Sequence, residues 1–262
     1  MLDRAANLAR RLIEPLLRFN LLDRSLALGA QAFCALIPLL IIIESAQPGN
    51  KSLADGLIDR FHLSGAAAET LRRAFTPPSG GTTTTALSFL LLIVSTLSFT
   101  RRLQRLYEES WDLPTRGLRG TGAGLAWLMA LVIYGTLHPL LDGLFDGFFA
   151  VVMSIAGGFT LALLTPFLLL GRRLPWQRLV GQAGLTAVGM VALGAWSAIY
   201  MPRAIASSAA SYGTIGVAFA LITWLWGLGI VLVCGAVYGA QLLSVRRSSP
   251  AGKSTARAAT SK

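Results

Sequence analysis

The sequence predicts an all-α polytopic membrane protein, and three observations lead to that fold class. Of the 262 residues, 54% are apolar and 13% are charged, against roughly 25% charged in soluble domains. Six apolar segments reach the length of about 20 residues that a membrane-spanning helix needs. Lys and Arg also alternate strongly between successive connections. Disorder is excluded because it requires low hydrophobicity, and a disulfide-stapled domain is excluded because the chain has two cysteines.

The six apolar segments define the expected spans. They run over 25–46, 82–100, 121–141, 148–170, 179–201 and 215–243. At 1.5 Å per residue the last would be roughly 43 Å long, which exceeds a hydrocarbon core of ~30 Å, so it should tilt, kink or project. A β-barrel is disfavoured because the runs are too long and do not alternate.

The distribution of basic residues predicts the orientation of these spans. Alternate compartments hold 18 and 5 Lys and Arg residues, and the richer side should be cytoplasmic. Both termini are therefore expected in the cytoplasm (N-in, C-in). With the acidic residues included, the two sides carry +12 and −1. Topology thus accounts for the net charge of +11, which gives no argument for a nucleic-acid partner.

Three regions are expected along the chain. Residues 1–24 form a basic cytoplasmic segment whose Leu8, Leu12, Leu16 and Phe19 share a helical stripe, as in an interfacial helix on an anionic leaflet. A loosely structured basic anchor is the alternative. Residues 25–243 form the six-helix transmembrane domain, and 244–262 form a disordered basic tail.

Short amphipathic interfacial helices are expected between spans. The outer loop 47–81 shows helical spacing around Leu57 and Phe61, an interruption at Ser64-Gly65, and renewed spacing around Leu71 and Phe75. Two short helices on the outer surface should result, where Phe61 and Phe75 could gate a lateral opening. Residues 103–113 should form a further amphipathic piece on the cytoplasmic side.

Ionisable residues near the outer ends of spans are candidate site residues, because such residues are costly in a membrane. They are Glu44, His138, Asp142 and Asp146. One interpretation is an outer vestibule lined by all four. The other is that they are solvated at headgroup depth.

Uncharged polar residues inside the spans are the second group of candidates. Gln31, Gln182 and Gln241 could contribute to a polar path. Alternatively, they form ordinary interhelical hydrogen bonds.

Prolines and glycines within the apolar segments predict how the helices bend and pack. Pro38 and Pro166 should each free a carbonyl and kink a helix. The spacing GxxxG, which permits close helix packing, is found at Gly120 with Gly124 and at Gly235 with Gly239.

The sequence offers no pattern for catalysis. It lacks a nucleotide-binding Walker A motif, a nucleophile elbow and a catalytic metal-ligand spacing. We therefore expect no enzyme, no cofactor and no metal.

Several segments carry a resemblance to a known family. Asp23-Arg24-Ser25 with the following apolar run through Pro38, the stretch RRLQRLYEESWDL at 101–113, and Arg173-Leu174-Pro175-Trp176 occur in order. The strongest match, 211–242, contains Tyr212-Gly213-x-x-Gly216 and Trp224. These segments resemble the YihY/BrkB family of inner-membrane proteins over about residues 20–245. One departure is Val237, where the family often has a glutamate.

The resemblance implies six spans in the bacterial inner (cytoplasmic) membrane and a role in the cell envelope. Two functions remain open. One is a transporter or lipid translocator without its own ATPase, with membrane lipids as partners. The other is a non-transporting scaffold or assembly factor for envelope integrity, with envelope proteins or a second copy as partners. An older family label, ribonuclease BN, is not carried over, because the chain lacks the metal-binding cluster of such nucleases.

Overall fold

The fold is known from a computed structural model that describes residues 14, 16, 19–46, 53–75, 82–142 and 148–248. Within these ranges the chain forms helices and connections and no strands, which confirms the all-α class. The helices are α2 (Leu21–Ala46), α3 (Leu53–Phe61), α4 (Gly65–Phe75), α5 (Thr82–Ser110), the short 3-10 helix η1 (Gly117–Gly120), α6 (Thr121–Asp142), α7 (Phe148–Leu169) and α8 (Trp176–Ser248).

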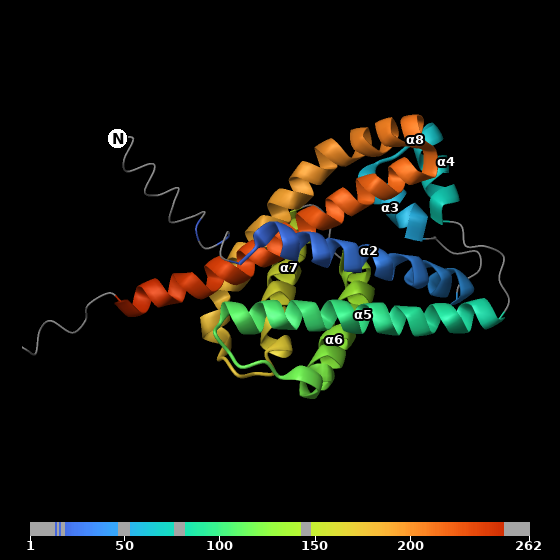
Figure 1. The fold of residues 1–262 in the computed structure, drawn as a ribbon. Helices are drawn as coiled ribbons and strands as arrows, with labels where there is room; N and C mark the ends of the chain where they lie inside the picture. Colours follow the sequence, from blue (N-terminus) through green and yellow to red (C-terminus); the bar gives the residue numbers. More distant parts are fainter. Residues whose placement is uncertain are drawn as a thin grey trace, which may run out of the picture.

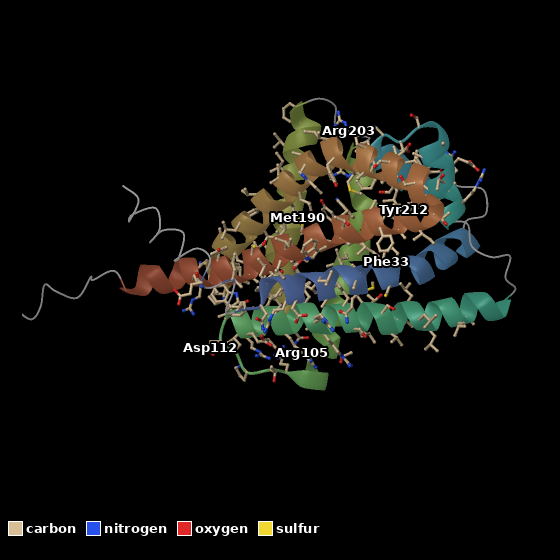
Figure 2. All side chains as sticks on the ribbon, turned by 45° about the horizontal axis from the view of Figure 1, so that its top comes forward. Phe33, Arg105, Asp112, Met190, Arg203 and Tyr212 are labelled. Atoms are coloured by element: carbon tan, nitrogen blue, oxygen red, sulfur yellow. The ribbon has the colours of Figure 1, made fainter. Side chains whose placement is uncertain are left out.

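The arrangement separates two sets of helices. α2, α5 and the returning arm of α8 run side by side along the molecule, while α6 and α7 cross them obliquely in both views (Figures 1 and 2). α3 and α4 cover the far end of α8. Among the described residues, one helix, Trp176–Gln241 within α8, is long and apolar enough to cross a membrane. Shorter apolar stretches lie at Thr121–Leu131 and Ile155–Leu169.

α5 joins two segments that the sequence suggested were separate. The apolar stretch from Thr82 and the amphipathic piece up to Ser110 form one helix of 29 residues. The helix ends in a Schellman motif, in which the Leu113 amide donates to the Glu108 carbonyl and Asp112 takes a φ of 51°. This turn sends the chain back along the last turns of α5.

α8 is a helical hairpin, and the loop expected after residue 201 is not there. Helical conformation continues through Pro202 and breaks only at Gly213, with φ 58° and ψ −136°. This region of backbone space is essentially restricted to glycine. The two arms then pack so closely that a Cβ at Gly216 would meet the Ser208 backbone. Tyr-Gly-x-x-Gly is thus the turn of the hairpin.

Tertiary contacts explain why helix replaces that loop. Met201 and Ile205 are fully buried in an apolar cluster with Phe61 and Leu71 of α3 and α4. Burying these side chains extends the helix beyond the apolar stretch. The helices α3 and α4 form on either side of Ser64 as predicted, but their apolar faces pack on α8.

The glycines expected at helix contacts all pack within this chain. Gly120 and Gly124 of η1 and α6 face Gln104 and Thr100 of α5. In α8, Gly235 and Gly239 of the returning arm face Thr186 and Gln182 of the first arm, respectively. At Gly239 a Cβ would meet the Cα and Cβ of Gln182, so the close approach of the two arms requires glycine there.

The structure also bears on the predictions for the helix prolines, the N-terminal apolar stripe and the C-terminal tail. α2 passes through Pro38 without interruption, and Pro166 lies in the last turn of α7. Leu16 and Phe19 pack against the core, while Leu8 and Leu12 of the expected apolar stripe lie outside the described residues. α8 continues to Ser248, four residues past the start of the expected tail. Most of that tail lies outside the described residues.

Candidate functional site

A cleft between α2 and α5 collects polar side chains at one end of the bundle. α5 lines it with residues three and four positions apart, which places them on one helix face. α2, running antiparallel, lines the other wall. The cleft has a volume of about 500 Å³ and is lined by Asp23, Arg24, Leu28, Gln31, Ser98, Arg101, Arg102, Arg105, Leu106 and Glu109.

The charges of the cleft are unbalanced. Arg24 of α2 forms a 2.5 Å ion pair with Glu109 of α5, which fastens the two helices together. The guanidinium groups of Arg101, Arg102 and Arg105 form no ion pair or hydrogen bond with any described residue. With Asp23 included, the lining carries four positive and two negative charges. The cleft therefore has a net positive charge.

The inner part of the cleft is polar but uncharged. Gln31 and Ser98 lie one to two turns inward from the arginines on their respective helices. The side-chain oxygen of Gln31 is buried and has no hydrogen-bond partner in the structure. A buried acceptor of this kind is costly unless it meets a donor.

A second cavity extends the cleft towards the loop after α5. Its volume is about 370 Å³, and it shares Arg101, Arg105 and Glu109 with the first. Figure 2 shows Arg105 and Asp112 towards this end of the bundle, with Tyr212 towards the other. Its lining carries two arginines and two glutamates, so the net positive charge belongs to the first cavity.

One lining residue of the second cavity, Glu108, is a buried carboxylate with an exposed fraction of 1%. It accepts hydrogen bonds from the side chain of Arg173 at 3.2 Å, the amide of Gln104 at 3.1 Å and the backbone amide of Arg116 at 3.3 Å. Arg173 also donates to the Pro114 carbonyl at 2.7 Å. These bonds join the end of α5, the loop that follows it and the loop before α8 into one cluster.

A second polar group of this cluster centres on Gln182. Its side-chain oxygen accepts a 2.7 Å hydrogen bond from the indole of Trp111. The buried phenol of Tyr107 is also hydrogen-bonded to Gln182, and burial raises the pKa of Tyr107 more than this bond lowers it. Tyr107 and Trp111 lie in 101–113, outside the predicted spans. Their contacts hold α5 against the first arm of α8.

A third contact joins the start of α2 to the returning arm of α8. The indole of Trp226 donates a 2.9 Å hydrogen bond to Ser25, which is fully buried. Gly29 and Gly229 allow the two backbones to approach, because a Cβ at either would clash with Trp226 or Ser25. These contacts connect α2 and α5, the two helices that line the cleft, to α8.

The structure separates the predicted site residues. Gln31 lines the cleft, Gln182 lies in the buried cluster, and Gln241 lies half-buried on the returning arm of α8. The proposed outer vestibule stays a prediction: Asp146 lies outside the described residues, as do the side chains of Glu44, His138 and Asp142. Phe61 is buried with an exposed fraction of 1% and stacks edge-on against Trp224. It therefore does not face an opening.

Sequence reasoning missed the arginines of the cleft and the buried Glu108. The arginines were counted only as markers of topology, although the spacing of Ser98, Arg101, Arg105 and Glu109 predicts one helix face. Glu108 was not identified as a candidate site residue. Its position among Leu103, Leu106, Tyr107 and Trp111 was a signal of burial.

Comparisons with known proteins give no match: no protein-family model, no curated protein and no solved structure is similar to this chain. Within the described ranges, no three His, Cys, Asp or Glu side chains are grouped so as to hold a metal ion.

Proposed function

We propose that this chain is a six-span protein of the bacterial inner membrane that moves lipids, or other amphipathic envelope components, without an ATPase of its own. Both termini lie in the cytoplasm in this proposal, and the chain belongs to the YihY/BrkB family. The basic cleft then opens at the cytoplasmic leaflet.

Exposed apolar side chains support the membrane part of the proposal. Leu125, Met129 and Ile133 recur every fourth residue on α6, and all are more than half exposed. α5, α7 and both arms of α8 also expose large apolar residues. Contiguous apolar surface of this kind is unfavourable in water, but it suits contact with lipid chains.

Contacts among the family-like segments support the family part. The stretch 101–113 meets Arg173 through Glu108, and Ser25 meets the last segment through Trp226. The glycines of Tyr-Gly-x-x-Gly make the hairpin turn. The segments that carry the resemblance therefore contact one another.

The cleft is the observation that carries the functional part. Its charged mouth at Arg101 and Arg105 leads inward to Gln31 and Ser98, so polar lining extends from the cytoplasmic end into the predicted span. A volume of about 500 Å³ lies in the range of small-molecule sites. A lipid headgroup can enter such a cleft while its chains stay in hydrocarbon.

The scaffold alternative could dock partners on the GxxxG faces or on the interfacial basic helices, and only the first kind of surface is addressed by the glycine contacts. The pairs Gly120 with Gly124 and Gly235 with Gly239 are both occupied by side chains of this same chain, so neither is free for a partner.

Leaflet exchange in vesicles tests the function. The full-length protein is reconstituted with a fluorescent phospholipid, and the fraction accessible to a membrane-impermeant quencher is followed over time. We expect exchange above that of protein-free vesicles and a slower rate with Gln31→Leu. Thr223→Val is the matched control, because Thr223 is exposed on α8 and bonds only its own helix. Wild-type rates equal to those of empty vesicles would refute lipid translocation.

A further inference from the structure

Among the described residues, the three arginines on one face of α5 form no ion pair or hydrogen bond, and the lining of the cleft carries four positive charges against two negative ones. Arg101 and Arg105 are four residues apart and Arg102 and Arg105 are three apart, and like charges at these spacings on a helix repel each other. Glu109, the carboxylate on the same face, is already paired with Arg24. An anion bound among these guanidiniums would relieve the repulsion.

The guanidinium group also selects the kind of anion. It presents planar pairs of N–H donors that match the oxygens of phosphate and carboxylate groups. Three such groups at the mouth of one cleft can surround a tetrahedral phosphate more fully than a planar carboxylate.

The inner wall adds a second requirement. The Gln31 oxygen is a buried acceptor with no partner, so the ligand should place a donor beside it. A hydroxyl or ammonium group attached to the phosphate meets this need, since the two walls line one cavity.

We infer that the α2–α5 cleft binds the phosphate of an anionic lipid headgroup through Arg101, Arg102 and Arg105, and that Gln31 accepts a hydrogen bond from the group beyond the phosphate. This assignment names the substrate class and rests on the proposed function for the lipid source of the phosphate. The exposed apolar faces of the neighbouring helices favour a lipid, whose chains would lie against them.

Calorimetric titration of the full-length protein in neutral detergent micelles tests the inference. The probes are micelles containing phosphatidylglycerol or phosphatidylcholine, and inorganic phosphate alone. We expect phosphatidylglycerol to bind more tightly than phosphatidylcholine, with affinity falling about fivefold for each arginine changed to glutamine. Arg178→Gln is the matched control, because Arg178 is exposed at the start of α8 and does not line the cleft.

Phosphatidylmethanol tests the role of Gln31, since it keeps the charge of phosphatidylglycerol but lacks the hydroxyl donors. Gln31→Leu should weaken binding of phosphatidylglycerol and leave that of phosphatidylmethanol unchanged. Equal weakening of both lipids would overturn the assignment of Gln31.

The remaining outcomes separate this inference from the proposed function. Unchanged preference for phosphatidylglycerol in the Arg101, Arg102 and Arg105 triple variant overturns the site, even where leaflet exchange persists. Intact preference without leaflet exchange overturns the translocation proposal and leaves the site standing. Inorganic phosphate that binds as tightly as the lipid supports the phosphate chemistry and overturns the lipid source.

Discussion

The two ends of the α8 hairpin are held in different ways. At the open end, where the arms begin and finish, charged and polar side chains of α5 and the loop before α8 surround Glu108 and Gln182. At the turn, α3 and α4 cover the arms with an apolar cluster around Phe61. Polar contacts require fixed geometry, whereas apolar packing depends mainly on buried area. The open end is therefore the end that can hold polar side chains in a fixed arrangement.

Loss of the Glu108 carboxylate should have the largest effect on stability. Glu108→Leu leaves Arg173 without its buried partner and the Arg116 amide unsatisfied, and we expect a loss of about 4 kcal/mol. Unfolding in mixed micelles measures it. Glu109→Gln is the matched control, because its carboxylate is 42% exposed and should contribute less than about 1 kcal/mol. Equal losses of stability in the two variants would show that burial of the carboxylate does not determine its contribution.

Truncation of the apolar cluster around Phe61 should have the second-largest effect on stability. Phe61→Ala removes a ring that is 1% exposed and lies 5.7 Å from the ring of Trp224. A cavity of this kind costs about 3 kcal/mol. The same unfolding measurement applies, with Leu90→Ala as control, since Leu90 is largely exposed. Because no residue of this cluster lines the cleft, phosphatidylglycerol binding should persist. Its loss would show that the two ends are coupled.

A substitution at the hairpin turn should have the third-largest effect on stability. Gly213→Ala forces a side chain into a backbone region that only glycine adopts readily, which costs about 2 kcal/mol. Gly184→Ala is the opposite control: nothing lies within 4 Å of its Cβ position, so better helix propensity should add up to about 1 kcal/mol. Stabilisation by both substitutions would contradict a glycine-dependent turn.

The sequence predicts those parts of the fold that depend on local pattern. α6 and α7 match the apolar segments 121–141 and 148–170 to within one residue at their ends, because apolar length sets their bounds. The α8 hairpin was missed between 202 and 212 because Met201 and Ile205 are buried by α3 and α4, which are distant in the sequence.

The candidate site was predicted less well for the same reason. Gln31 was identified from its polarity within an apolar stretch. Glu108 and the cleft depend on contacts with Arg173, 65 residues away, and with the antiparallel α2. No spacing within one helix predicts which distant residue completes such a site.

The smallest effect expected at the open end concerns the Tyr107 phenol. Tyr107→Phe removes its hydrogen bond to Gln182 and should cost about 1 kcal/mol at neutral pH. Burial holds the pKa of Tyr107 above its ordinary value of 10.0, so above pH 10 the unfolded chain loses the phenol proton before the folded one. Wild-type stability should therefore fall with rising pH there by up to about 1.4 kcal/mol per pH unit.

The phenylalanine variant lacks that proton, so its deficit should shrink above pH 10 and vanish about one pH unit higher. Unfolding measured between pH 7 and 11 follows this convergence. Tyr212→Phe is the control for loss of a phenol, because this side chain is exposed beside the hairpin turn, and its variant should keep the wild-type stability at neutral pH. If the stability curves of the wild type and Tyr107→Phe stay parallel across pH 10, the folded chain does not shield this phenol from water. That result would weaken the contrast between the open end of α8 and its turn.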